Sequence, residues 1–384
     1  MEDLVVRSWD PAQLAGAYEG KRVLVTGHTG FKGGWLTLWL TDLGAEVTGY
    51  SLAPRTTPAL FEVANIGDLC ESVIADIDDE VQLRTTLRRV RPDFVFHLAA
   101  QALVRRGHEE PILTIETNVL GTARVLEAVR QEALRCCVVV VTSDKCYAER
   151  DAPWGFREDE PLGGNDVYSM TKGAAELVSA SYRHSFFPPE RLASHGVAIA
   201  TARAGNVVGG GDWAQDRLLP DAVVALAKRL PIRVRNPGSV RPWQHVLEPV
   251  GGYMLLGARL AGFGTDRPGG FCEAWNFGPR TEDACSVKEL VEKVVAEWGE
   301  GRWVHEPDSS APPEAAALRL SVEKAYARLG WAPAWPLGGS IARTVEWYKA
   351  FYRGSTVSAV DLMRRQIAEY AAAVSAKGRG AGAG

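Results

Sequence analysis

Tyr168 and Lys172 have the residue types and the spacing that acid–base chemistry on a hydroxyl group requires. They stand four positions apart in a segment of helical character, so both side chains are expected on one face of a helix. An ammonium group beside a phenol lowers the phenol pKa, and such a phenol can take a proton from a hydroxyl while a hydride leaves the same carbon. The pair therefore predicts a dehydrogenation step, and the alternative interpretation is a surface pair that only supports the helix.

A second polar group, Ser143, Asp144 and Lys145, lies in the run TSDKCY at residues 142–147. The run follows an apolar segment, 136–141, that is typical of a strand buried on both faces of a parallel sheet. Ligands bind at the carboxyl edge of such sheets, so a hydroxyl, an acid and an amine at that edge indicate a reaction site. The alternative is a local ion pair between Asp144 and Lys145.

Three glycines, Gly27, Gly30 and Gly33, form a GxxGxxG pattern between an apolar segment and a helical one. In that position the pyrophosphate of a dinucleotide can meet backbone N–H groups at a helix N-terminus, because no Cβ blocks its approach. The pattern predicts a dinucleotide cofactor, and the alternative is a flexible turn.

The end of the second expected strand leaves the choice between NAD and NADP open. A carboxylate that would bind the ribose 2′-hydroxyl is normally found there, but the segment ends in Tyr50 and Ser51, with Arg55 nearby. Asp76, after the next apolar segment, is a candidate for the adenine amino group, although a solvated turn aspartate fits the sequence equally well.

The elements that must position these residues alternate between strands and helices. This alternation predicts an α/β fold with a doubly wound, Rossmann-type parallel sheet and right-handed crossovers. The expected strands are 22–26, 46–50, 93–100, 136–143 and 197–203, and the expected helices are 35–44, 80–90, 111–133 and 168–184.

The chain divides into a dinucleotide-binding domain and a smaller C-terminal substrate-binding lobe. After residue 205, glycines and prolines interrupt every potential long element, which indicates a lobe built from insertions. The expected boundaries are an N-terminal extension at 1–19, the dinucleotide-binding domain at 20–205 with its sheet completed by about 241–276, the lobe at 206–240 and 277–372, and a disordered tail at 373–384.

The composition and charge of the chain argue against several classes of binding partner. The 384 residues carry a formal net charge of −4, with 23% charged and 46% hydrophobic residues, so a nucleic acid partner is not expected. The six cysteines form no CxxC pair, which argues against a metal site and a disulfide framework. No apolar run is long enough for a membrane span and the N-terminus is acidic, so the cytoplasm is the expected compartment.

The sequence resembles the extended short-chain dehydrogenase/reductases, and within that family the sugar-nucleotide 4,6-dehydratases that act on CDP-glucose. The resemblance covers roughly residues 20–350. It rests on VTGHTGFKGGWL at 25–36, FHLAAQALVR at 96–105, TSDKCY at 142–147, YSMTKG at 168–173, RAGNVVGGGDWAQDRLLPD at 203–221, RPWQHVLEP at 241–249 and WNFGP at 275–279.

The resemblance implies an internal redox reaction on CDP-glucose with NAD as cofactor. Tyr168, together with Ser143, would deprotonate the sugar hydroxyl at carbon 4. Asp144 would protonate the departing hydroxyl and Lys145 would take the carbon 5 proton. The 4-keto-6-deoxy sugar nucleotide would be the product.

The resemblance also implies two sets of binding residues. The expected cofactor-binding residues are Gly27, Gly30, Phe31, Lys32, Gly33, Asp76, Ile77, Leu98, Ala99, Ala100, Asn118, Thr142, Tyr168 and Lys172. The expected substrate-binding residues are Asn206, Arg217, Val234, Arg235, Asn236 and Arg241, with the arginines suited to diphosphate oxygens and Val234 and Asn236 expected to flank the cytosine.

Two other classes of function compete with this interpretation. A 4-epimerase of the same fold would need Tyr168 and Lys172 but no acid and base for elimination, so Asp144 and Lys145 argue against it. A non-catalytic dinucleotide sensor would keep the glycine loop and lose the Tyr168 and Lys172 pair. The helices expected at 111–133 and 168–184 commonly form a dimer interface in this fold, so a homodimer or homotetramer is expected.

Overall fold

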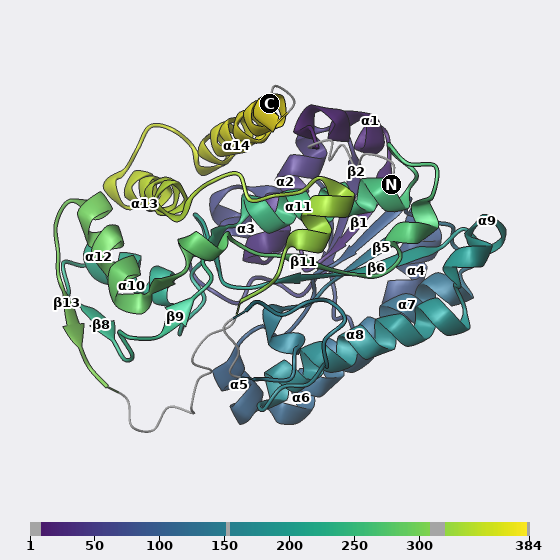
Figure 1. Ribbon diagram of the computed structural model, residues 1–384, viewed down its shortest axis with the longest axis horizontal. Coiled ribbons are helices and arrows are strands. Elements are labelled where there is room, and N and C mark those ends of the chain that lie inside the picture. Colours follow the sequence, from purple (N-terminus) through teal and green to yellow (C-terminus); the bar gives the residue numbers. More distant parts are fainter. Residues whose placement is uncertain (1–8, 151–153, 308–318, 382–384) are drawn as a thin grey trace.

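The centre of the molecule is a seven-stranded sheet in which all neighbouring strands run parallel. The computed structural model describes residues 9–150, 154–307 and 319–381 (Figure 1). In spatial order the strands are β11 (Ala274–Phe277), β6 (Ala198–Ala204), β5 (Cys137–Val141), β4 (Phe94–His97), β1 (Arg22–Thr26), β2 (Glu46–Ser51) and β3 (Glu71–Ile74). This order reverses between β1 and β4, as in dinucleotide-binding folds, so the predicted fold class is confirmed.

Helices cover both faces of the sheet, so β4, β5 and β6 are buried along their whole length. One face packs in a large apolar cluster with α1 (Leu14–Tyr18), α2 (Phe31–Asp42), α11 (Leu247–Leu260) and α14 (Ala359–Ala381). The opposite face packs against α4 (Glu80–Val90), α7 (Gly121–Gln131) and α8 (Val167–Ser185). Figure 1 shows these two helical layers on either side of the strands.

A smaller lobe extends from the carboxyl edge of the sheet and is built from two segments of the chain (Figure 1). Its short strands pair as β8 with β13 and as β9 with β12. Its elements are α10 (Leu218–Ala227), β8 (Ile232–Val234), β9 (Val240–Arg241), β12 (Cys285–Ser286), α12 (Val287–Trp298), β13 (Trp303–His305) and α13 (Leu337–Arg353).

Short elements complete the chain. Two strands, β7 (Val207–Val208) and β10 (Gln244–His245), pair beside the main sheet. The others are η1 (Pro11–Gln13), α3 (Leu60–Val63), η2 (Ile66–Asp68), α5 (Val104–Glu109), α6 (Pro111–Ile115), η3 (Glu116–Leu120), η4 (Asp144–Cys146), η5 (Pro189–Arg191), α9 (Leu192–His195), η6 (Pro268–Phe271), η7 (Thr281–Asp283) and η8 (Ala325–Leu329).

Two expectations about the elements need correction. The helix expected at 111–133 is interrupted by η3, a π-helical turn, and divides into α6, η3 and α7. The tail expected to be disordered from 373 instead continues α14 as far as Ala381, because Val374 is buried and Lys377 Nζ donates to the Pro333 carbonyl at 2.8 Å. Residues 382–384 lie outside the described residues.

Candidate active site

The glycine loop between β1 and α2 has the close backbone approach that a bound pyrophosphate needs. Gly27 has φ +80°, and a Cβ there would lie 2.8 Å from the Ala99 nitrogen. A Cβ on Gly33 would lie 2.0 Å from the Gly27 carbonyl oxygen. Gly30 precedes α2, whose first N–H groups have no partner within the helix. The loop therefore fits a dinucleotide, since side chains would fill the cradle and break the turn.

The remaining residues expected to bind the cofactor surround this loop at the carboxyl ends of β1, β3 and β4. Phe31 and Lys32 lie in the first turn of α2, and Leu98, Ala99 and Ala100 follow β4 directly. Asp76 is exposed and its carboxylate accepts from the Asp78 backbone N–H, while its neighbour Ile77 is buried. The loop, the exposed carboxylate and the segment after β4 thus border one edge of the sheet.

The last residues of β2 form hydrogen bonds through their hydroxyl groups. The Tyr50 hydroxyl donates to the Asp76 carbonyl at 2.9 Å, and Ser51 Oγ lies 2.9 Å from Thr29 Oγ1. No carboxylate ends this strand, as the sequence indicated, so the site lacks the usual acidic partner for a ribose 2′-hydroxyl.

Asn118 lies in the π-turn η3 and joins two parts of the site. Its Oδ1 accepts from the Gln101 N–H at 2.8 Å, and its Nδ2 donates to the Gln101 carbonyl and to Thr171 Oγ1 at 3.0 and 2.9 Å. These bonds fix the segment after β4 against α8. π-turns inside helices occur frequently at functional sites, and here the turn directs the Asn118 amide to both partners.

Tyr168 and Lys172 lie in α8, which begins after Asp166, whose side chain accepts from the Ser169 N–H. Both residues are buried. Burial raises the pKa of Tyr168 to about 12, while a hydrogen bond with Ser143 lowers it. Burial lowers the pKa of Lys172 to about 8.

The hydrogen bond of Lys172 and the groups that act on the Tyr168 phenol come from different parts of the site. Lys172 Nζ donates to the Val141 carbonyl at 3.4 Å, and the groups that favour the ionised phenol are Ser143 and Arg217. The ammonium group of Lys172 thus contacts the end of β5.

Asp144 is a buried acid with one free oxygen. Its Oδ1 accepts from Ser143 Oγ at 2.9 Å, while its Oδ2 has no hydrogen-bond partner among the described residues. A Cβ on Gly205 would lie only 2.8 Å from Oδ2, so the glycine leaves space for the carboxyl group. Burial raises the pKa of Asp144, although Lys145 and Ser143 lower it. This environment favours the protonated acid, which can donate a proton to a leaving group.

Lys32 extends from α2 toward the catalytic residues as well as the glycine loop. Burial and the positive charges of Arg217 and Lys172 lower its pKa to about 7, and Asp144 raises it. Its ammonium group is thus part of the same charge cluster as Asp144, which the sequence did not indicate.

A cavity of about 640 Å³ lies in the lobe between α10 and β8. Its lining includes Arg105, Asp216, Asp221 and Arg235. Arg217 follows Asp216 in the chain. Its positive charge lowers the pKa of Tyr168, and it forms an ion pair with Asp212 at 2.8 Å. The cavity lining thus carries basic side chains, among them Arg105 and Arg235, together with acidic ones.

The other residues expected to bind substrate differ in their placement. Asn236 is exposed, Asn206 and Arg241 are half-buried, and the Asn206 carbonyl accepts from the Gln244 N–H. Val234 does not line the cavity, since its side chain is buried in the main apolar cluster. The alternation along β8 directs Arg233 outward and Val234 inward.

Two residues under the site were missed by the sequence analysis. Glu176 and Arg203 form an ion pair of 2.9 Å and both side chains are about 3% exposed. Glu176 follows Lys172 by one helical turn, and that spacing on the same helix face was the available signal.

Two classes of feature are absent from the described parts of the chain. Across residues 9–150, 154–307 and 319–381, no three His, Cys, Asp or Glu side chains are grouped so that they could hold a metal ion. Within the same ranges, no helix has the length and apolar character needed to cross a membrane.

Comparison with known proteins assigns the chain to a family. Residues 24–344 match the model of the GDP-mannose 4,6-dehydratase family. CDP-glucose 4,6-dehydratase of Salmonella typhimurium is 48% identical over 93% of this chain and 98% of that protein. UDP-glucose 4-epimerase of Mycolicibacterium smegmatis is 29% identical over 85% of this chain and 98% of that protein.

A solved structure supports the same assignment. A double mutant of dTDP-glucose 4,6-dehydratase from Streptomyces venezuelae, with NAD bound, matches with a TM-score of 0.70 and 25% identity over 87% of this chain and 98% of that one. The chain therefore belongs to the GDP-mannose 4,6-dehydratase family of extended short-chain dehydrogenase/reductases.

Proposed function

We propose that the protein is an NAD-dependent CDP-glucose 4,6-dehydratase, a hydro-lyase that converts CDP-D-glucose to CDP-4-keto-6-deoxy-D-glucose. The observation that carries this proposal is Asp144, a buried acid with a raised pKa and a free Oδ2, beside Ser143, Tyr168 and Lys145. An acid of this kind is what elimination of water requires. The 48% identity to the Salmonella typhimurium CDP-glucose 4,6-dehydratase supports the same reaction.

The glycine loop, Asp76 and the segment after β4 would hold NAD. When bound, NAD would accept a hydride from sugar carbon 4 and return it to carbon 6. Because the hydride is returned within one turnover, the protein's own residues need only move protons and hold the sugar in place.

Tyr168 would remove the proton from the hydroxyl at carbon 4 as the hydride leaves the same carbon, and the loss of both gives a 4-keto sugar. Ser143 and Arg217 favour the ionised phenol that this step needs. Lys172 lies one turn further along α8 and supports the same end of the site through the Val141 carbonyl.

The ketone makes the proton on carbon 5 acidic, and elimination follows. Lys145 takes that proton, the carbon 6 to oxygen bond breaks, and Asp144 donates the proton that converts the departing hydroxide to water. A double bond then joins carbons 5 and 6. After carbon 6 is reduced, Lys145 returns a proton to carbon 5, so the net change is the loss of one water.

The cavity between α10 and β8 would take the cytidine diphosphate. Arg217, Arg235 and Arg241 carry the charge that the two phosphates need, and Asn206 and Asn236 lie near the same lobe elements. Asp221 lines the cavity, and burial raises its pKa to about 6.

A 4-epimerase is the competing activity within this fold, and a sugar-nucleotide dehydratase with another base is the nearest alternative. An epimerase has no step that needs the free oxygen of Asp144. The chain would act as a homodimer or homotetramer through α7 and α8. We place it in the cytoplasm, where six free thiols are usual.

The test is incubation of the purified protein with NAD and, separately, CDP-, UDP-, dTDP- and GDP-hexoses, followed by mass analysis. We expect CDP-glucose alone to lose one water, without stoichiometric release of reduced cofactor. Tyr168→Phe is the control, since it removes only the phenol oxygen and should abolish the reaction. Isomerisation without loss of mass would establish an epimerase instead, and release of reduced cofactor would contradict the proposal.

A further inference from the structure

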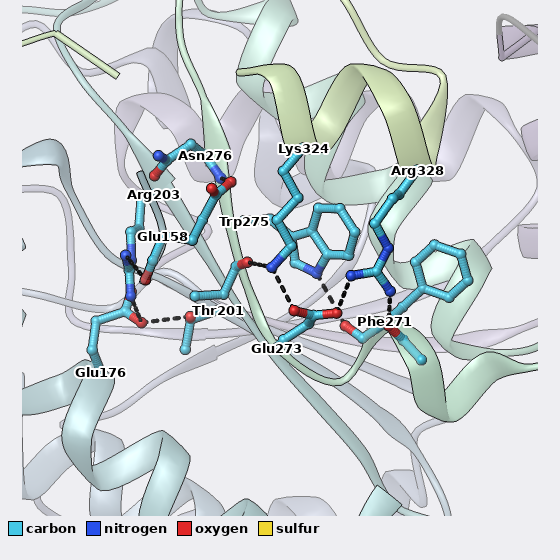
Figure 2. Close-up of polar contacts among 12 residues, drawn as sticks. Glu158, Glu176, Thr201, Arg203, Phe271, Glu273, Trp275, Asn276, Lys324 and Arg328 are labelled. Carbon is cyan, nitrogen blue, oxygen red and sulfur yellow. Dashed lines mark hydrogen bonds and ion pairs between the residues drawn. The ribbon is translucent and has the colours of Figure 1, made fainter. Parts of the chain in front are cut away.

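A buried ion pair connects helix α8 to the segment 142–147. Neither of its residues touches the reacting sugar in the proposed mechanism. Figure 2 shows Glu176 of α8 and Arg203 of β6, with Thr201 beside Glu176. Both side chains are about 3% exposed. Burying two charges is costly, and apolar residues of similar size would often serve stability as well. The pair therefore calls for a role besides stability.

Glu176 holds the first residue of the catalytic run. Its carboxylate accepts from Thr142 Oγ1 at 2.5 Å, from Thr201 Oγ1 at 2.6 Å and from Arg203 at 2.9 Å. Burial alone would raise the pKa of Glu176, but Arg203 and the two threonine hydroxyls lower it below its usual value. The carboxylate is thus ionised, and one of its bonds reaches the residue before Ser143.

Arg203 holds the last residue of the same run. Its Nη1 donates to the Tyr147 hydroxyl at 2.7 Å, and its guanidinium lies 4.8 Å from the centre of the Tyr147 ring. The Tyr147 hydroxyl in turn donates to Asn276 Oδ1 at 2.7 Å. The two residues of one ion pair therefore hydrogen-bond to the first and the last residue of the segment 142–147.

Glu176 also lies on the helix that carries the residues for oxidation. Tyr168, Lys172 and Glu176 are spaced at intervals of four residues along α8, so they share one face. Lys172 Nζ donates to the carbonyl of Val141, the residue directly before the segment 142–147. The ion pair thus connects the oxidation residues on α8 to the elimination residues between Thr142 and Tyr147.

We propose that Glu176 and Arg203 are positioning residues that fix Asp144 and Lys145 in register with Tyr168. The inference rests on the proposed function. Glu176 acts on the segment through its hydrogen bond with the Thr142 hydroxyl. Arg203 acts on it through its hydrogen bond with the Tyr147 hydroxyl.

Thr142→Val and Thr201→Val form a matched pair of variants that tests this role. Both replace a buried threonine with an isosteric side chain, and both remove one hydrogen bond to the Glu176 carboxylate. Only Thr142 belongs to the catalytic segment. In single turnovers with NAD and CDP-glucose, Thr142→Val should slow water loss at least about tenfold, so that reduced cofactor persists, with KM little changed.

Thr201→Val should stay within about twofold of the wild type, because β6 carries no residue of the reaction next to it. Thr142→Ser keeps the hydroxyl and should restore the rate. Tyr147→Phe, which releases the other end of the segment, should also make reduced cofactor persist. Equal losses in the two valine variants, or decay of reduced cofactor at the wild-type rate in Thr142→Val, would overturn the proposal.

A measurement without substrate separates this proposal from the proposed function. Hydrogen–deuterium exchange should become faster across 142–147 in Thr142→Val and stay at the wild-type rate there in Thr201→Val. Unchanged exchange in both variants overturns the positioning role. A wild-type protein that fails to dehydrate CDP-glucose while the exchange differs would overturn only the assigned reaction.

Discussion

Asp144 and Lys145 are neighbours in sequence, yet the structure gives them different environments. Asp144 is about 3% exposed with a raised pKa, whereas Lys145 is half-buried. Two titratable groups in unlike environments can take opposite parts in one proton transfer. In the proposed mechanism these adjacent residues at the end of β5 would supply the acid and the base of the elimination.

Lys145→Ala should block the elimination and leave the oxidation intact, because Tyr168 and Ser143 are unchanged. Reduced cofactor should form in a single turnover and persist, and solvent deuterium should fail to enter carbon 5. General-base catalysis contributes about 10²–10⁴-fold, so turnover should fall by about that factor. Lys288→Ala, which removes a surface lysine, is the control. Near-normal turnover in Lys145→Ala would leave Lys145 only an ion-pair partner of Asp144.

The residues of the proposed reaction are easier to identify in the sequence than the residues that hold them in place. Tyr168, Ser143 and Asp144 stand out because their chemistry and their place after a buried strand are visible in the sequence. Arg203 looks like any arginine in an apolar strand, and its burial against Glu176 depends on β6 and α8 packing together. The inward direction of Val234 likewise depends on the pairing of β8 with β13.

Helices were predicted well where their apolar period is regular, as in α4 and α8. The π-turn at η3 was not predicted, because a single extra residue per turn leaves the composition of a helix unchanged. Its cause is tertiary: the Asn118 amide has to reach both Gln101 and Thr171. Such a constraint is visible only once the segment after β4 and helix α8 are brought together.

The outward faces of η3 and α8 leave large apolar side chains in solvent. Leu120 is 45% exposed, Leu177 60% and Phe186 47%. η3 and α7 both pack against α8, so Leu120 and Leu177 come from neighbouring elements of one helical layer. Apolar side chains gathered in this way favour burial against a second copy of the chain.

Leu177→Glu should therefore weaken self-association, since a charge would be buried in the interface. Light scattering of the eluted protein should give an assembly of two or four copies for the wild type and a smaller mass for the variant. Val357→Glu changes a side chain of 47% exposure outside these helices and should leave the mass unchanged. A monomeric wild type, or an unchanged mass for Leu177→Glu, would contradict the proposed assembly.

Several histidines are buried in the folded chain and couple its stability to pH. Burial lowers the pKa of His28 to about 4 and those of His97 and His245 to about 3. His97 is held between Thr26 Oγ1 and Thr122 Oγ1 at 2.8 and 3.2 Å. Between pH 6.5 and these values only the unfolded chain takes up the protons, so the free energy of unfolding falls as pH falls through this window.

Glu248 has the opposite effect on how stability changes with pH. Burial raises its pKa to about 7, although the Trp335 and Ala334 N–H groups and the Tyr370 hydroxyl lower it. The folded protein therefore holds a proton that the unfolded chain releases between about pH 4.5 and 7, and acidification across this window adds stability. The net slope of stability against pH combines both effects, so single variants are needed to separate them.

His97→Gln isolates one histidine, because glutamine offers a donor and an acceptor to the two threonines and does not titrate. With a folded pKa of about 3 and an unfolded value of about 6.5, His97 should cost about 2 kcal/mol of stability at pH 5 relative to pH 8. Urea unfolding at both pH values should therefore show the wild type losing about that much more than His97→Gln. Equal losses would mean that His97 takes up its proton in the folded state, which requires that Thr26 and Thr122 move apart to accommodate an imidazolium.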